Sequence, residues 1–229
     1  MRSGPVFCFD LDDTLISEED YVESGLCAAG GLIDALTPPA GERAGDRLVQ
    51  LWRAERASDG FQRLLQERNL DPGWWLPKLK QAYRDHEPIL HPRVGATDLL
   101  SVIVGRGGKL ALVSDGWLEV QRRKWSALAL PFPFNPVVFT DERGRDYWKP
   151  HSWSFEQVMA AHPTAARFFY VGDNPAKDFI APNRLGWTTV LVRDGRNLHS
   201  SAVCEDPNAT SDLVVESLDE ISGIVQQIL

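Results

Sequence analysis

Short apolar runs recur along this chain, and most of them stop at a polar residue. They cover Pro5–Phe9, Lys109–Ser114, Pro136–Thr140, Arg167–Gly172, Thr188–Val192 and, more weakly, Leu213–Val215. Uninterrupted apolar runs of this length are typical of strands that are covered on both faces. We therefore expect these runs to form the strands of a parallel sheet.

Segments with a helical spacing of apolar residues lie between the later runs. They cover Pro92–Arg106, Trp117–Leu130, Ser152–Ala161 and Pro175–Leu185, and Pro182 is expected to kink the last one or end it early. Alternation of short buried strands with helices is the signature of a doubly wound sheet. The predicted fold class is therefore α/β, with a Rossmann-like doubly wound parallel sheet.

One long segment breaks this alternation directly after the first run. It carries no convincing strand and four helical stretches, at Glu18–Leu36, Gly41–Ala57, Gly60–Asn69 and Trp74–His86. We interpret it as an all-helical domain inserted into the α/β domain. The predicted domains are residues 1–16 and 92–229 for the Rossmann-like core and residues 17–91 for the inserted helical cap.

Composition narrows the range of partners. The formal charge of the 229 residues is -8 at pH 7, so no basic field is available to hold a nucleic-acid backbone. Three cysteines (Cys8, Cys27 and Cys204) are too few and too scattered for a disulfide framework or a zinc cluster. No long apolar stretch follows a basic region near the N-terminus, so we expect neither a signal peptide nor a membrane span, and the expected compartment is the cytoplasm.

Acidic and hydroxyl residues follow several of the predicted strands. They are Asp10, Asp12, Asp13 and Thr14 after the first, Ser114 and Asp115 at the second, and Asp173 and then Asp178 after the fourth, while Lys149 follows the third. In an open α/β sheet, ligands bind at the carboxyl ends of the strands. The pattern therefore predicts a metal and phosphate site at this edge.

These residues resemble the four motifs of the haloacid dehalogenase-like (HAD) hydrolase superfamily. Asp10–Thr14 matches the first motif, Leu112–Ser114 the second, Lys149 the third, and Gly172–Asp173 with Asp178 the fourth. The helical insertion between the first two motifs is similar to the inserted cap of that family. The resemblance implies a phosphatase with a Rossmann-like catalytic core.

The chemistry of these side chains suggests a role for each. Asp10 would attack phosphorus and form an aspartyl-phosphate, and Asp12 would protonate the leaving alkoxide and then take a proton from water. Anionic neighbours are expected to favour the protonated form of Asp12. Mg²⁺ is expected on Asp10, on Asp173 and, as the resemblance implies, on the backbone carbonyl of Asp12.

The remaining motif residues are expected to bind phosphate or to support the site. Ser114 and the backbone N–H of Asp115 would donate to phosphate, and Lys149 would neutralise Asp10 and the phosphate. Asp178 would orient Lys149 or order a metal-bound water, and Thr14 would support the first motif. The family more often has asparagine at the position of Asp115, so the extra charge is a departure.

Several of these residues also have a purely structural interpretation. Asp10 and Asp12 could form a turn, and Ser114 could cap the helix expected at Trp117. Lys149 could be an ordinary surface lysine, and Asp178 a solvated residue in the first turn of a helix.

Three functions stay open at this point. Asp12 argues against a dehalogenase, because a halide leaves without a proton, and so favours a phosphatase. A phosphomutase keeps both aspartates, and a non-catalytic phosphate-ligand-binding protein is possible on the same fold. The substrate is expected to be a small phosphorylated metabolite, with a sugar phosphate first and a nucleoside monophosphate second. We expect no nucleic-acid or membrane partner, and a monomer or small homo-oligomer.

Overall fold

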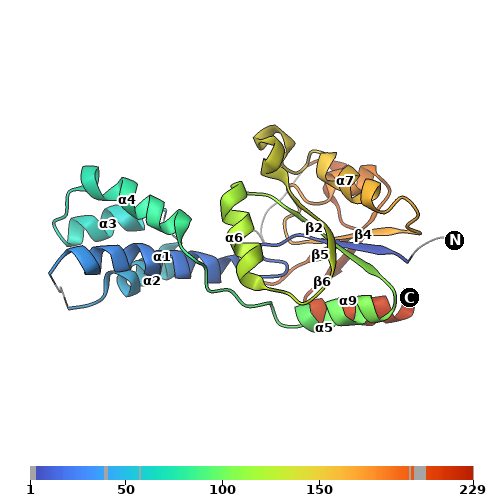
Figure 1. The fold of residues 1–229 in the computed structure, drawn as a ribbon, viewed down its shortest axis with the longest axis horizontal. Coiled ribbons are helices and arrows are strands. Elements are labelled where there is room, and N and C mark those ends of the chain that lie inside the picture. Colours follow the sequence, from blue (N-terminus) through green and yellow to red (C-terminus); the bar gives the residue numbers. More distant parts are fainter. Residues whose placement is uncertain (1–3, 39–40, 57, 196, 199–204, 229) are drawn as a thin grey trace. The chain divides into compact units, whose positions relative to one another are not determined.

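The computed structural model describes residues 4–38, 41–56, 58–195, 197–198 and 205–228 (Figure 1). The chain divides into two compact units. We call residues 1–18 and 90–229 the α/β unit, and residues 19–89 the helical unit. Among the described residues, no helix is both long and apolar enough to cross a bilayer.

The α/β unit contains a sheet of six strands, all of them paired in parallel. The strands are β1 (Val6–Phe9), β2 (Lys109–Ser114), β3 (Phe134–Phe139), β4 (Phe168–Gly172), β5 (Thr188–Val192) and β6 (Leu213–Val215). Their order is β3-β2-β1-β4-β5-β6, which confirms the predicted α/β class with a doubly wound parallel sheet. Strand β3 begins two residues before the predicted run, because Phe134 already pairs with Leu110.

Helices cover both faces of this sheet (Figure 1). They are α5 (Ala96–Gly105), α6 (Leu118–Leu128), α7 (Trp153–Ala161), α8 (Ile180–Arg184) and α9 (Leu218–Ile228). Helices α5 and α9 pack side by side below the sheet in the view of Figure 1, and α7 lies above it. Phe155 of α7 packs edge to face against Tyr170 and Trp187, in a core that includes Cys8.

Two helix predictions are wrong in their extent. The predicted helix Pro175–Leu185 is reduced to α8, because the carbonyl of Asn174 accepts hydrogen bonds from the backbone N–H groups of Lys177 and Asp178 and so forms a turn there. Helix α5 begins only at Ala96, since Gly95 before it has a left-handed φ of 81°.

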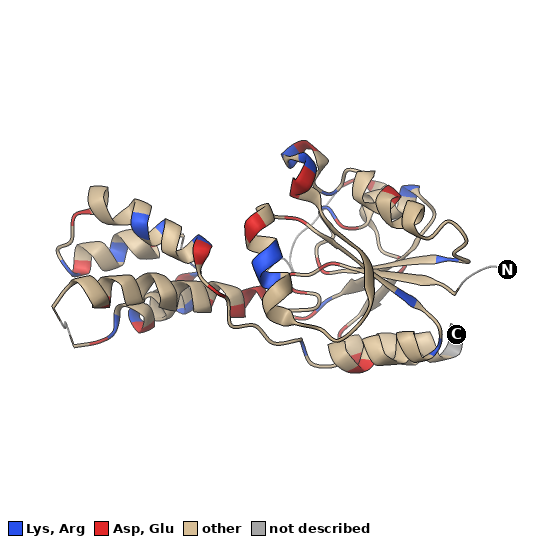
Figure 2. Ribbon diagram, viewed as in Figure 1, with Lys and Arg blue, Asp and Glu red and all other residues tan. Residues whose placement is uncertain are grey.

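The helical unit is made of α1 (Glu18–Leu36), α2 (Ala44–Glu55), α3 (Gly60–Glu67) and α4 (Pro72–Asp85). Leucine, isoleucine and alanine side chains from these helices form its core, together with the buried Trp75. On the surface, acidic and basic residues alternate (Figure 2) and join neighbouring segments through ion pairs, at Arg47–Glu67, Arg53–Glu23, Arg63–Glu55 and Arg68–Asp34. The role of this unit as a cap stays a prediction.

Glycines allow α1 and α2 to approach each other closely. A Cβ atom added to Gly30 would lie 2.1 Å from the backbone nitrogen of Gly45 and 2.4 Å from its Cα. No real Cβ atom tolerates such distances, so the two helices meet only because both positions lack a side chain. The adjacent Gly31 has no neighbouring atom within 4 Å of the same point.

This contrast predicts opposite effects for two neighbouring substitutions. We expect Gly30→Ala to lower the free energy of unfolding of the helical unit by about 1–3 kcal/mol, because the helices must separate. Gly31→Ala should instead raise it by up to about 1 kcal/mol through helix propensity. Urea denaturation followed by circular dichroism measures both, and equal effects of the two variants would contradict the packing argument.

Candidate active site

The predicted site residues lie at the carboxyl ends of three neighbouring strands. Phe9 at the end of β1 pairs with Leu112 of β2 and with Val171 of β4. The backbone N–H of Asp10 continues the ladder and donates to the carbonyl of Val171 at 2.9 Å. The parallel register therefore brings the first, second and fourth motifs to one edge of the sheet.

Lys149 is fully buried between two carboxylates. Its Nζ lies 2.9 Å from Oδ1 of Asp10 and 2.8 Å from Oδ1 of Asp178, and it donates to the hydroxyl of Tyr170 at 3.0 Å. Burial alone would lower the pKa of Lys149, but the carboxylates of Asp10 and Asp178 hold it well above its usual value. The interpretation of Lys149 as a surface lysine does not fit this environment.

Asp178 is buried as well and precedes α8, so it is not a solvated helix residue. Its Oδ1 contacts Lys149, and its Oδ2 accepts from the backbone N–H of Asn174 at 2.9 Å. Gly172 allows this contact, since a Cβ there would lie 2.5 Å from Oδ2 of Asp178. Asp178 thus fixes both the lysine and the turn after β4.

Three carboxylates gather in a small volume beside Lys149. Asp10, Asp173 and Asp178 each offer an oxygen, and these oxygens lie within 4.8 Å of one another. Burial raises the pKa of Asp10 to about 6 against the opposing effect of Lys149. Burial, followed by the charges of Asp178 and Asp10, raises the pKa of Asp173 to about 9.

Asp173 has an acceptor that the protein leaves unsatisfied. Its Oδ2 is buried and has no hydrogen-bond partner among the residues that the structure describes. A buried carboxylate oxygen without a donor is costly, and carboxylate oxygens are the ligands that hard divalent cations prefer. The donor set of Asp10 and Asp173 therefore fits a metal ion such as Mg²⁺.

The carboxylate of Asp115 is held by donors from three segments. It accepts from Oγ1 of Thr140 at 2.7 Å, from the backbone N–H of Lys149 at 3.1 Å and from Nζ of Lys177 at 3.2 Å. Burial would raise the pKa of Asp115, but the charges of Lys149 and Lys177 hold it below its usual value. The extra negative charge at this position is thus locally compensated.

Asp12 has a cation beside it as well as the acidic neighbours expected from the sequence, since Asp10, Asp13 and Glu18 all interact electrostatically with it. Lys124 of α6 places its Nζ 2.7 Å from Oδ1 of Asp12. Gln121 of the same helix donates from Nε2 to Oδ2 of Asp12 at 2.7 Å. Helix α6, which follows β2, therefore supplies both side chains that hold the carboxylate of Asp12.

Ser114 does not cap α6. Its Oγ accepts from Nε2 of Gln121 at 2.7 Å. The first N–H group of α6, at Leu118, donates instead to Oδ2 of Asp141 at 3.0 Å. The hydroxyl of Ser114 therefore belongs to the same hydrogen-bonded group as Asp12.

The other residues of the first motif are buried in the loop after β1. Oγ1 of Thr14 is buried and, within the described part of the chain, has no hydrogen-bond partner. Asp13 accepts from the backbone N–H groups of Glu18 at 2.9 Å and Leu198 at 2.6 Å. Asp13 therefore shapes the loop, as expected for a local hydrogen-bonding residue.

Several residues that contact the site were missed in the sequence: Gln121, Lys124, Thr140, Tyr170 and Lys177. Gln121 and Lys124 are three residues apart and so share one face of a helix, but this spacing is also typical of an exposed polar face and does not mark a site. Tyr170 was hidden within an apolar strand. No spacing signal marks Thr140 or Lys177.

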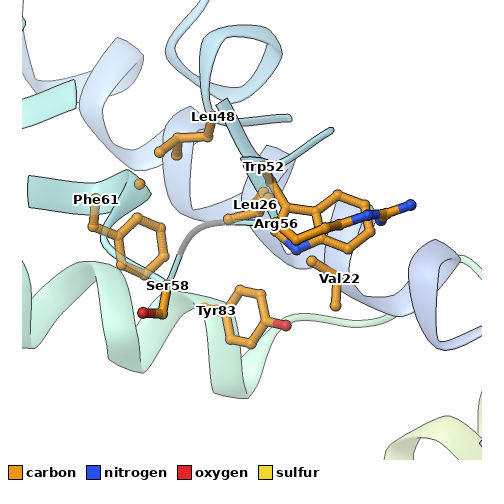
Figure 3. Close-up of a pocket in the computed structure, with 9 residues that line it drawn as sticks. Val22, Leu26, Leu48, Trp52, Arg56, Ser58, Phe61 and Tyr83 are labelled. Atoms are coloured by element: carbon orange, nitrogen blue, oxygen red, sulfur yellow. The ribbon is translucent and has the colours of Figure 1, made fainter. Parts of the chain in front are cut away.

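The helical unit has a pocket of its own (Figure 3). It has a volume of about 290 Å³ and lies between the four helices, lined mainly by apolar and aromatic side chains that include Leu26, Trp52, Phe61 and Tyr83. The guanidinium of Arg56 stacks over the ring of Trp52 at 4.0 Å and pairs with Glu19 at 2.9 Å. The pocket is therefore apolar with a charged rim.

Comparisons with known proteins agree with these motifs. The HAD-hydrolase-like family model matches residues 147–221. A glyceraldehyde 3-phosphate phosphatase from Methanopyrus kandleri is 30% identical over 201 residues, which are 82% of this chain and 83% of the relative. The chain belongs to the HAD hydrolase superfamily.

Two further relatives extend over nearly all of the HAD chain. A glyceraldehyde 3-phosphate phosphatase from Methanocaldococcus jannaschii is 26% identical over 226 residues, with 96% of each chain covered. A HAD hydrolase from Bacillus subtilis, solved with bound magnesium, matches with a TM-score of 0.64 and 20% identity over 98% of this chain and 99% of that one, which shows the shared fold. The chain is a phosphatase of this superfamily.

The burial of Lys149 predicts a large loss of stability when its charge is removed. Lys149→Met leaves Asp10 and Asp178 buried without their ammonium partner, which should lower the free energy of unfolding by about 3–5 kcal/mol. Urea denaturation in EDTA measures this loss. The matched control is Lys177→Met, which should cost about 1 kcal/mol or less, because Lys177 is 31% exposed and Asp115 keeps two other donors. Similar losses of stability in both variants would contradict the conclusion that Lys149 offsets the buried charges of Asp10 and Asp178.

Proposed function

We propose that this HAD phosphatase is Mg²⁺-dependent and hydrolyses a small phosphorylated metabolite through an aspartyl-phosphate on Asp10. One observation carries the proposal. Asp10 contacts the fully buried Lys149, and an oxygen of Asp173, a residue whose Oδ2 is unsatisfied among the described residues, lies within 4.8 Å of an oxygen of Asp10. This arrangement suits an anionic nucleophile that must meet an anionic substrate. The cytoplasm stays the expected compartment.

Asp10 would be the nucleophile. Phosphoryl transfer needs positioning and neutralisation of charge more than a strong base, so a carboxylate suffices. Its Oδ1 is fixed by Lys149, whose ammonium also offsets the charge of an incoming phosphate. Ser114 and the backbone N–H of Asp115 would donate to the phosphate oxygens. Asp178 keeps Lys149 in place.

Asp12 would be the general acid and base. It gives its proton to the ester oxygen as the P–O bond breaks and the bond from Asp10 to phosphorus forms. Water then attacks phosphorus, Asp12 takes the proton from that water, and Asp10 and inorganic phosphate are released. While Asp12 carries a proton, the ammonium group of Lys124 would still donate a hydrogen bond to Oδ1, because the carbonyl oxygen of a carboxylic acid remains an acceptor.

Asp10 and Asp173 would hold the Mg²⁺, together with the backbone carbonyl of Asp12. When bound, the cation would neutralise charge on the phosphate and on the surrounding carboxylates. The unsatisfied oxygen of Asp173 supports this assignment.

The helical unit would act as a cap that selects the substrate, with bounds near residues 17 and 91. A sugar phosphate is our first choice of substrate and a nucleoside monophosphate our second. Two relatives that cover most of the chain are named for a three-carbon sugar phosphate, which supports a short substrate. A phosphomutase would instead transfer the phosphoryl group to a second hydroxyl of the substrate. A non-catalytic phosphate-binding protein would show no hydrolysis of any phosphate ester.

The nucleophile is tested by a single substitution. We expect wild-type enzyme with Mg²⁺ to hydrolyse p-nitrophenyl phosphate and glyceraldehyde 3-phosphate, measured as phosphate release. Asp10→Asn should reduce kcat on the order of 10³-fold or more, since the nucleophile is lost. A nucleoside monophosphate is assayed in parallel, and its kcat/KM is compared with that of glyceraldehyde 3-phosphate. Activity that survives in Asp10→Asn would contradict the mechanism.

The metal is tested by thermal unfolding, independently of turnover. Mg²⁺ should raise the Tm of the wild-type protein, because a cation relieves repulsion among Asp10, Asp173 and Asp178. Asp173→Asn removes one carboxylate, so it should fold normally in EDTA and lose the response to Mg²⁺. EDTA should abolish hydrolysis by the wild type. A Tm that ignores Mg²⁺ in the wild type, or a full response in Asp173→Asn, would rule out this site.

A further inference from the structure

Two side chains of α6 hold the carboxylate of Asp12, and neither belongs to the four motifs. Gln121 donates to Oδ2 of Asp12 and Lys124 pairs with Oδ1, each at 2.7 Å. They are three residues apart and so project from the same face of the helix. Both oxygens of Asp12 are therefore fixed from one side.

The polar character of these two positions has no explanation in packing alone. The side chain of Lys124 is 5% exposed and Gln121 is 1% exposed. Burying an ammonium group costs several kcal/mol unless a close anion offsets the cost, whereas leucine at either position would cost nothing of this kind. The contact with Asp12, together with the nearby charge of Glu18, compensates for the burial of Lys124.

Gln121 also connects Asp12 to the phosphate-binding residue Ser114. Its Nε2 donates to Oγ of Ser114 at 2.7 Å, so the hydroxyl hydrogen of Ser114 remains to be donated elsewhere. Gly116 makes room for this amide, since a Cβ at that position would lie 3.0 Å from Cδ of Gln121. The backbone φ of Gly116, 132°, also favours glycine.

We propose that Gln121 and Lys124 are positioning residues, which aim Asp12 at the leaving group and the Ser114 hydroxyl at the phosphate. This proposal rests on the proposed phosphatase mechanism. Lys124 contacts Asp12 through Oδ1, so it serves the step that needs a proton. Gln121 acts on both residues, so it serves proton transfer and phosphate binding together.

Two substrates with different leaving groups separate these roles. Glyceraldehyde 3-phosphate releases an alkoxide that needs a proton, and p-nitrophenyl phosphate releases a phenolate that does not. We expect Lys124→Met to lower kcat/KM for glyceraldehyde 3-phosphate about 10²-fold, the usual scale of a general acid. The same variant should change kcat/KM for p-nitrophenyl phosphate less than about threefold, and Lys124→Arg should restore most of the loss.

Gln121→Met, which is close in volume, should raise KM for both esters because the orientation of Ser114 is lost. The Gln121→Met variant tests the proposal even if Lys124→Met does not fold. Arg122→Met is the matched control, since Arg122 lies on the same helix with 49% of its side chain exposed and should leave both esters unaffected. Thermal unfolding of each variant accompanies the kinetics.

Three outcomes would overturn the proposal. A loss in Lys124→Met that is equal for both esters would mean a structural role, and no loss for either ester would mean no role. Normal KM values in a folded Gln121→Met would exclude the link to Ser114. If the wild-type enzyme hydrolyses neither ester, the phosphatase mechanism fails, and this proposal fails with it.

Discussion

The Lys149 ammonium lies between the carboxylates of Asp10 and Asp178, and the arrangement around it depends on that charge. A parallel sheet brings the ends of its strands together, so acidic residues at those ends must share a small volume. Lys149 offsets two of the three carboxylates, and Asp173 keeps an oxygen with no partner. Folding of this edge and the proposed binding of a cation therefore involve the same group of charges.

The two units differ in the interactions that stabilise each of them internally. The α/β unit has a core that reaches the site, since Tyr170 packs against Phe155 and its hydroxyl also contacts Lys149. Changes in that core therefore act on the lysine directly. The helical unit has a separate core, surface ion pairs and a close glycine contact between α1 and α2. The stability of the helical unit thus depends largely on contacts within that unit.

The sequence was sufficient where local pattern decides the structure. Apolar runs define β1, β2, β4 and β5 almost to the residue, and parallel pairing then forces Asp10, Ser114 and Asp173 to one edge. The assignment of Lys149 to the site depended on the motif. The alternation of strands and helices could not predict where a residue in the long loop between β3 and α7 would lie.

Pattern failed where tertiary contacts decide. Gln121 and Lys124 lie in a segment rich in charged residues that reads as solvent-exposed, and only the packing of α6 against the strand ends makes them buried. The helix expected from Pro175 is absent in its first part, because Asp178 bonds to Lys149 and to the backbone of Asn174. Each error involves a partner far away in the sequence, which is Asp12 for Lys124 and Lys149 for Asp178.

The pairing of Asp115 with Lys177 has a consequence for how such a site can evolve. An asparagine at position 115 would remove the carboxylate that Lys177 contacts at 3.2 Å. The ammonium group of Lys177 would then keep its electrostatic interaction with Asp10 but lose its ion pair. The fitness effect of changing either residue thus depends on the identity of the other. Among descendants of this sequence, the two positions should drift as a pair, with each constraining the substitutions open to its partner.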